Sequence, residues 1–159
     1  MEWLSLHNFL LFCHLLGALL FVAGIVLAGV LFEVARRSER PAEIAVLLAV
    51  ARIGVVLVAL GGLMVPLFGL WLVHLDGFDY GACWISGALT LYVVAMLLGG
   101  YGGQQPKRAR LLASELAGRG EGVSTELRAL LDDRLSRAAN YLSALLILVV
   151  LVLMVYKPS

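Results

Sequence analysis

The stretch HLLGALLFVAGIVLAGVLF, residues 14–32, contains no Asp, Glu, Lys or Arg and lies within an apolar segment that covers residues 5–32. A helix rises about 1.5 Å per residue, so about 20 apolar residues cross the roughly 30 Å hydrocarbon core of a bilayer. The segment lacks the alternation of polar and apolar residues that is typical of a strand, and it therefore predicts a transmembrane helix. No Lys or Arg precedes it, and it is longer than the apolar region of a signal peptide, so we expect a retained first span.

Three more apolar segments are long enough to cross a membrane, at residues 44–73, 82–101 and 138–156. In lipid every backbone N–H and C=O group must find its partner within the protein, so these segments should be helices. The chain is 62% hydrophobic and 14% charged, against about 45–50% and about 25% in soluble domains. We predict an all-α fold: a transmembrane antiparallel four-helix bundle forming one membrane domain over residues 1–159, with a cytoplasmic helical loop at 102–137 between spans three and four.

Lys and Arg are concentrated in two of the segments between the spans. Residues 33–43 and 102–137 hold ten of the twelve, whereas residues 74–81 hold none. Basic loops remain in the cytoplasm, which predicts an inner (cytoplasmic) membrane location with the N-terminus and the C-terminus both outside. Aromatic side chains then form a belt at the outer surface: Trp3, Trp71, Tyr80, Trp84 and Tyr156. This distribution of charge excludes nucleic-acid binding.

The third loop is the sizeable polar region of the chain, and its helix start and stop residues predict two helices. The first should start near Pro106 and stop at Gly118. The second should have Ser124 or Thr125 as its N-cap and continue unbroken into the fourth span. The glycine-rich run 99–103 should terminate the third span, because it lacks the lysine and the strand context of a phosphate-binding loop.

Several charged residues have predicted partners. Arg128 and Asp132, and likewise Asp133 and Arg137, stand four residues apart and should form surface ion pairs. Arg52 should reach the headgroup level from the first turns of span two. Basic residues expected to contact anionic lipid or a partner protein are Arg36, Arg37, Arg40, Arg52, Lys107, Arg108 and Arg110.

His14 lies within the first span, where an ionisable side chain is costly and normally faces protein or a water-filled cavity. Gly17, Phe21 and Gly24 follow it on the same helix face, because residues three and four apart share a face. One hypothesis is a groove for a flat cofactor such as haem b, with His14 as axial ligand and Met64 as the second axial candidate. The alternative is a neutral histidine bonded to a neighbouring helix, with glycines that allow close packing.

A second group of possible ligands lies at the predicted outer surface. His7 and His74 fall at about the same depth, 16 to 17 Å from the midplane by helix rise. Asp76 and Asp79 belong to the same level. Two imidazoles with a carboxylate suit copper, zinc or a non-haem metal. The alternative is that these side chains are only solvated, since their spacing matches no standard ligand motif.

Pro66 interrupts the second span and frees the Gly62 carbonyl from its helical hydrogen bond, which permits a kink. Gly54, Gly61 and Gly69 lie in the same span. A kinked, glycine-rich helix could line a substrate cavity, move in gating, or serve close packing between helices.

Three stretches carry a family resemblance. They are His14-Leu15-Leu16-Gly17 through Gly24, Pro66 followed by Gly69-Leu70-Trp71-Leu72, and the ending Met154-Val155-Tyr156-Lys157-Pro158. In these the chain resembles a bacterial family of predicted integral membrane proteins of unknown function, the DUF2269 type. It is also similar to the copper-resistance D membrane proteins and the HemJ-type protoporphyrinogen oxidases, in which a first-helix histidine is implicated in metal or haem binding. That similarity implies His14 as a ligand, although the HemJ-type membrane Lys has no match in this chain.

The leading functional hypothesis is a membrane protein that binds haem b or a metal ion such as copper through His14, in a redox or cofactor-handling role. One alternative is a structural or accessory subunit without its own catalysis, in a homo-oligomer or a larger membrane complex. Another is a small transporter that works around the Pro66 kink.

Overall fold

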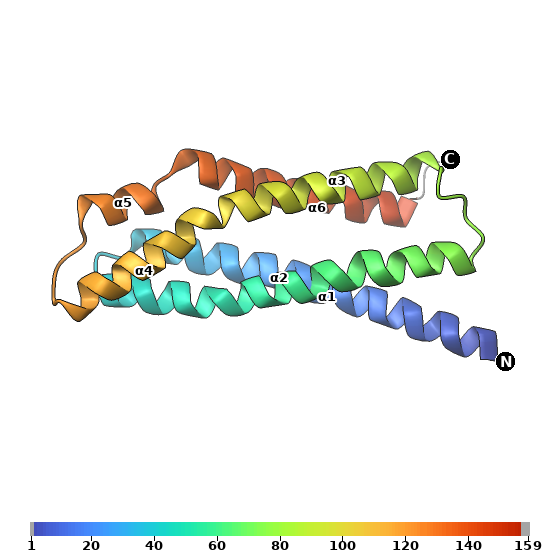
Figure 1. Ribbon diagram of the computed structural model, residues 1–159, viewed down its shortest axis with the longest axis horizontal. Helices are drawn as coiled ribbons and strands as arrows, with labels where there is room; N and C mark the ends of the chain where they lie inside the picture. The colour runs from blue at the N-terminus through green and yellow to red at the C-terminus, as the bar shows by residue number, and fades with distance from the viewer. Residues whose placement is uncertain (1, 157–159) are drawn as a thin grey trace.

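The computed structural model describes residues 2–156, and the side chains of residues 5–156, so the predicted belt residue Trp3 is outside the described side chains. The described part contains the helices α1 (Glu2–Arg37), α2 (Pro41–Leu75), α3 (Cys83–Gly102), α4 (Gln104–Gly118), α5 (Thr125–Leu131) and α6 (Arg134–Tyr156). Four segments are long and apolar enough to cross a membrane. They are Ser5–Arg37 in α1, Pro41–Leu75 in α2, Cys83–Gly118 in α3 and α4, and Thr125–Tyr156 in α5 and α6. These findings confirm the predicted all-α membrane bundle. Figure 1 shows the long helices aligned along one axis as two pairs, α1 with α2 and α3 with α6.

The α1–α2 pair is held by glycines at which the two backbones meet. A Cβ atom added at Gly24 would lie 2.6 Å from the Gly54 carbonyl oxygen, and one added at Gly54 would lie 2.7 Å from the Gly24 oxygen. About two turns further from the head, a Cβ at Gly61 would collide with the Gly17 oxygen and the Phe21 nitrogen. Small residues allow such an approach, and in lipid the resulting van der Waals contact stabilises helix pairs.

The α3–α6 pair is held by side chains of α6 that bind backbone carbonyls of α3. Ser136 Oγ donates to the Gly102 oxygen at 2.6 Å, Asn140 Nδ2 donates to the same oxygen at 3.2 Å, and Ser143 Oγ donates to the Ala95 oxygen at 2.7 Å. Pro106 has no N–H group, so Gly102 lacks its helical donor. The two α6 side chains supply the missing hydrogen bonds.

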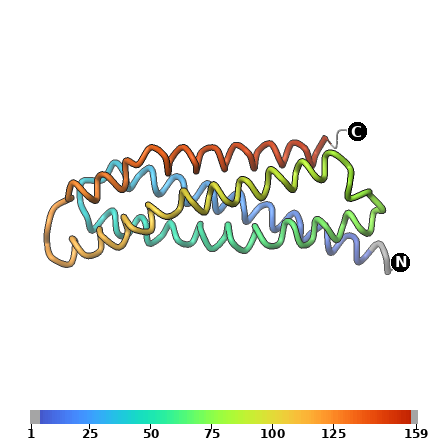
Figure 2. Tube along the Cα trace, turned by 45° about the horizontal axis from the view of Figure 1, so that its top comes forward, coloured from blue at the N-terminus to red at the C-terminus, as the bar shows by residue number. Residues whose placement is uncertain are grey.

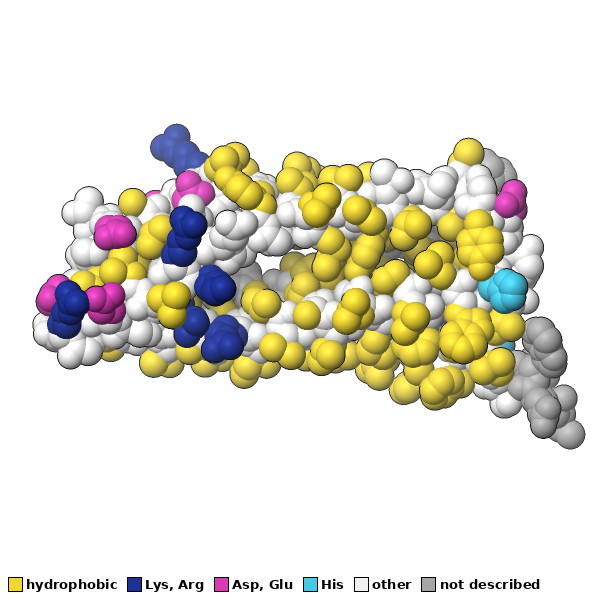
Figure 3. Space-filling view, viewed as in Figure 1, with side chains coloured by type: hydrophobic (Ala, Val, Ile, Leu, Met, Phe, Trp, Pro, Cys, Tyr) yellow, Lys and Arg dark blue, Asp and Glu magenta, His cyan; other side chains and the backbone are white. Residues whose placement is uncertain are grey.

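One end of the molecule has a packed core resembling that of a water-soluble domain, and we call it the head: residues 32–37 of α1, residues 41–48 of α2, α4 and α5, together with the connecting loops 38–40 and 119–124. Its buried side chains come from all four helical segments: Phe32, Ala35, Ile44, Leu48, Ala109, Ala113, Leu116, Leu127 and Leu131. Figure 2 shows α4 continuing the direction of α3 over this end of the molecule and α5 turning back beside it. The charged side chains gather here, and apolar side chains cover the remaining length (Figure 3).

One prediction about the third loop is wrong. The second loop helix does not run unbroken into the last span, because α5 ends at Leu131 and α6 begins at Arg134. Asp133 causes a new start: its Oδ2 accepts from the Ser136 nitrogen at 2.7 Å, as an N-cap does. The prediction that the glycine run 99–103 ends the third span is confirmed, because α3 ends at Gly102 with Gly103 as its C-cap, and α4 begins directly afterwards at Gln104. The predicted N-cap Ser124 is confirmed, since its Oγ accepts from the Leu127 nitrogen.

The predicted Arg128–Asp132 ion pair is replaced by contacts with the end of α1, and the predicted Asp133–Arg137 pair is not formed among the described side chains. Arg128 donates to the Arg36 carbonyl at 2.7 Å and to the Ser38 carbonyl at 3.2 Å, where its charge complements the helix C-terminus. Asp132 pairs with Arg36 at 3.2 Å instead of with Arg128. These bonds attach the head to the end of the first span.

Candidate functional site

A cavity of about 510 Å³ lies between the two helix pairs, in the half of the bundle away from the head. Its walls are mostly apolar side chains of α1, α2, α3 and α6, including Leu11, Val22, Leu89 and Leu151. Figure 3 shows this face hollowed between α3 and α2. The cavity is therefore lined by membrane-spanning helices and is open at the face between α2 and α3.

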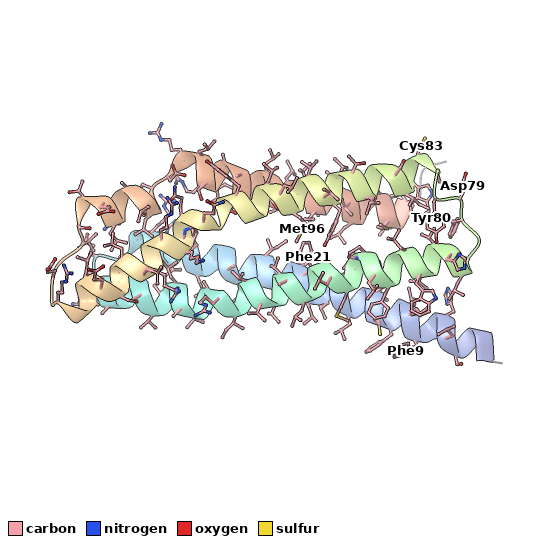
Figure 4. The ribbon with its side chains drawn as sticks, viewed as in Figure 1. Phe9, Phe21, Asp79, Tyr80, Cys83 and Met96 are labelled. Carbon is pink, nitrogen blue, oxygen red and sulfur yellow. The ribbon has the colours of Figure 1, made fainter. Side chains whose placement is uncertain are left out.

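An aromatic floor closes the cavity toward the head. Phe21 is 4% exposed, and its ring centroid lies 6.0 Å from that of Tyr92. Phe21 and Met96 point into the space between the two pairs (Figure 4). At the other end Phe78 and Trp84 line the cavity and meet edge to face, with centroids 5.7 Å apart. The connection between α2 and α3 thus lies over the end of the cavity away from the head.

His14 lines this cavity and is fixed in one tautomer by its backbone partner. Its Nδ1 lies 2.9 Å from the Val65 carbonyl oxygen. A carbonyl can only accept, so Nδ1 carries the proton and Nε2 of the neutral ring keeps a lone pair. Gly69 makes room for the ring, because a Cβ there would lie 2.9 Å from His14 Cε1. The arrangement matches the orienting hydrogen bond that metal-ligating histidines make through their other nitrogen.

Pro66 lines the same cavity, and the Gly62 carbonyl that it leaves without a helical partner joins the two helix pairs. The missing N–H of Pro66 leaves the Gly62 carbonyl without a helical donor. The Tyr92 hydroxyl from α3 donates a hydrogen bond to this oxygen. Because that proton is used, the Tyr92 oxygen can offer only its acceptor capacity to a ligand.

The residues predicted to hold a flat cofactor are only partly brought together. His14 and Phe21 both line the cavity. Gly17 and Gly24 do not, because α2 fills the space they leave: the Cβ of Met64 lies 2.7 Å from a Cβ built at Gly17. Met64 itself is outside the cavity lining. The glycine face therefore packs helices, and the cavity lies beside it.

The second predicted ligand group, of two histidines and two aspartates, is not brought together as a whole either. His7 Nε2 and Asp76 Oδ1 are 3.1 Å apart, and both residues line the cavity mouth. His74 is exposed, and Asp79 accepts from the Gly81 nitrogen at 2.9 Å. Within the described side chains, no three His, Cys, Asp or Glu residues form a group that could hold a metal ion.

The basic residues predicted to contact lipid or a partner fall into two classes. Arg36 pairs with Glu33 at 2.9 Å and Arg40 with Glu43 at 3.4 Å. The remainder have no carboxylate partner among the described side chains, and all are exposed except the half-buried Arg110: Arg37, Arg52, Lys107, Arg108 and Arg110.

The sequence also matches a family of predicted integral membrane proteins over residues 8–158, nearly the whole chain. The protein belongs to the DUF2269 family. No curated protein and no solved structure matches it. The family's description supports a membrane location for the helix pairs described above.

In this DUF2269 member, sequence reasoning missed Tyr92 and the α6 residues Ser136 and Asn140. A signal for them was present, because a proline inside a helix leaves a carbonyl that a hydroxyl or amide from another helix must satisfy in lipid. Pro66 and Pro106 each imply such a donor. Which donor takes which carbonyl depends on how the helices pair.

Proposed function

We propose that this protein binds haem b within the membrane through His14, in a redox or cofactor-handling role. The observation that carries the proposal is the His14 ring, whose Nδ1 is bonded to Val65 at 2.9 Å and whose other nitrogen retains a lone pair beside an apolar cavity. An imidazole held in this way is a ready axial ligand.

The polar atoms of His14 and Tyr92 determine which kind of ligand the cavity can bind. Both the His14 ring and the Tyr92 hydroxyl have their protons bound to carbonyls, of Val65 and Gly62. Each therefore offers lone pairs, which suit a Lewis-acidic centre or a hydrogen-bond donor. The apolar walls suit a large hydrophobic body, and about 510 Å³ falls within the range of about 300–1,000 Å³ that is typical of ligand pockets. Iron in a hydrophobic macrocycle meets both conditions.

A visible spectrum tests the proposal. The protein is expressed with added haem precursor, purified in mild detergent, and examined for a Soret band and for haem after extraction. We expect stoichiometric haem in the native protein, loss of it in His14→Gly, and recovery when imidazole is added. Met64→Leu is the matched control and should keep the band, because Met64 lies outside the cavity lining. No Soret band in the native protein would contradict the proposal and would favour an accessory-subunit role, for which co-purification with a larger complex is the test.

A second candidate is a copper or other metal ion at the His7–Asp76 pair. The two side chains already lie 3.1 Å apart, and each is 36% exposed, so water or a ligand could complete the coordination. Metal analysis of the native protein and of His7→Ala would decide it. Equal metal content in both would contradict this site, whereas the haem proposal would be unaffected.

We also propose that the head lies in the cytoplasm and both termini lie outside, because the head holds most of the Lys and Arg residues. The exposed Cys83 is a natural reporter at the opposite end of the bundle (Figure 4). A thiol reagent that cannot cross membranes should label Cys83 in intact cells. It should fail to label Gly122→Cys in a Cys83→Ser background, where the new side chain meets no neighbouring atom within 4 Å. The reverse pattern would overturn the orientation.

A further inference from the structure

Four basic side chains near the junction of α2 and α4 have no ion-pair partner among the described side chains: Arg52, Lys107, Arg108 and Arg110. Other arginines of the head are neutralised within the protein, Arg36 by Glu33 and Asp132, and Arg119 by Glu115. Figure 3 shows dark-blue side chains gathered over α2 and α4 where the head meets the apolar part of the molecule. This part of the surface carries positive charge that the protein itself leaves uncompensated.

The packing of α2 against α4 places these residues at one level. The two helices run in opposite directions (Figure 1), and Leu48 of α2 shares a buried cluster with Ala109 of α4. Arg52 follows Leu48 by one turn, and Arg108 precedes Ala109 by one residue. Both side chains are exposed, at the point where α4 gives way to α3. They therefore border the same junction from opposite sides.

This level coincides with one edge of the apolar surface. From Arg52 to His74 is about 33 Å along α2 at 1.5 Å per residue, close to the hydrocarbon thickness of a bilayer. Beyond Arg52 the exposed side chains of α2 are apolar, beginning with Ile53, Val55 and Val56. A charged group bound here would lie at headgroup depth, with an apolar helix surface beside it for acyl chains.

A polar group at the same junction also lacks a partner. Gln105, in the first turn of α4, has a buried Oε1 atom without a hydrogen-bond partner among residues 5–156. A buried acceptor of this kind costs free energy unless a donor reaches it. The Gln105 residue as a whole is only half-buried, so when its amide turns toward the junction a headgroup that carries a hydroxyl group as well as a phosphate can supply that donor.

We propose that Arg52, Lys107 and Arg108 bind the phosphate of an anionic phospholipid whose headgroup carries a hydroxyl, as in phosphatidylglycerol, with Gln105 accepting from that hydroxyl. Arginine forks and lysine ammonium groups are the side chains that recognise phosphate. The depth of the site and the adjoining apolar surface favour a lipid over a soluble anion. The site is separate from the cavity and stands independently of the haem proposal.

Native mass spectrometry of the full chain in detergent, titrated with phosphatidylglycerol or phosphatidylcholine, tests this inference. We expect one retained phosphatidylglycerol, bound at least tenfold more tightly than phosphatidylcholine, and about tenfold weaker retention in the double variant Arg52→Gln, Arg108→Gln. The matched control is Arg40→Gln, Arg119→Gln, which removes two charges that are engaged in ion pairs. Retention should be unchanged in this control.

Three results would overturn the inference. One is an equal loss of lipid in the two double variants, since it would indicate a general charge effect. Another is equal retention of the two lipids by the native protein. The last is displacement of the bound lipid by inorganic phosphate at matched concentration, since it would indicate a soluble-anion site. Gln105→Leu gives an independent readout and should weaken phosphatidylglycerol while leaving phosphatidic acid, which lacks the hydroxyl, unaffected.

Discussion

The two helix pairs of this protein solve the same packing problem by different means. Between α1 and α2 the backbones touch at glycines, and the groups opposite Gly61 are the backbone atoms of Gly17 and Phe21. Between α3 and α6 the contacts are polar side chains on carbonyls, and the atoms opposite Gly102 belong to the side chain of Asn140. Lipid offers little hydrophobic driving force between helices, so close contact and interhelical hydrogen bonds are the available alternatives.

This difference indicates which pair of helices can adjust its packing. Backbone atoms cannot move without moving the whole helix, whereas a side-chain amide can turn away. The α1–α2 pair should therefore be the rigid half of the molecule and the α3–α6 pair the adjustable half. Since the cavity lies between them, its width should change chiefly through α3 and α6.

The largest expected effect is at Gly61. Gly61→Ala places a Cβ against the Gly17 oxygen and the Phe21 nitrogen, so α1 and α2 must separate. We expect a loss of about 3 kcal/mol in the free energy of unfolding, at the upper end for overpacking. Unfolding by SDS in mixed micelles measures it. Gly29→Ala is the control on α1, since a Cβ there meets no atom within 4 Å, and it should change stability by less than about 0.5 kcal/mol.

The second effect is at Gly102, and it should be reversible by a second substitution. Gly102→Ala displaces the Asn140 side chain and costs about 2 kcal/mol through the clash and the lost hydrogen bond. Adding Asn140→Ala removes the opposing atoms, so most of the clash should disappear. The same unfolding assay applies. No combination of this kind exists for Gly61, and failure of the rescue would mean that the two pairs do not differ as described.

The third effect concerns the bond that joins the pairs. Tyr92→Phe leaves the Gly62 carbonyl without a donor and should cost about 1 kcal/mol. In a Pro66→Ala background the helix supplies its own N–H to that carbonyl. The cost of Tyr92→Phe should then fall close to zero, which a double-mutant cycle measures. Equal costs in both backgrounds would show that the proline does not create the requirement for Tyr92.

The smallest effect distinguishes interhelical from local hydrogen bonds. Ser143→Ala removes the bond to Ala95 and should cost about 0.6 kcal/mol, the average for polar contacts between membrane helices. Thr90→Val removes a bond to Ser86 within α3 itself, where the carbonyl keeps its helical partner. Its cost should not be measurable. A larger loss from Thr90→Val than from Ser143→Ala would contradict the assigned roles.

The sequence by itself determined the fold class and the number of spans, because long apolar segments can satisfy their backbone groups in lipid only as helices. It also limited the N-cap of α5 to Ser124 or Thr125, since that signal is local, and Ser124 is the N-cap in the structure. The prediction of an unbroken helix through Asp132 and Asp133 was wrong. Asp132 pairs with Arg36 of α1 and Asp133 accepts from the Ser136 nitrogen, and the spacing of residues within this segment does not reveal these partners.

Only the tertiary structure decided which helices pair and where the cavity lies. The sequence predicted a glycine face beside His14 but could not tell whether a ligand or a helix would occupy it, since both require small residues. Likewise Pro66 implied an open carbonyl at Gly62, but the choice of Tyr92 as its donor followed from the placement of α3. Local chemistry creates such requirements, and the three-dimensional arrangement of the helices determines which group meets them.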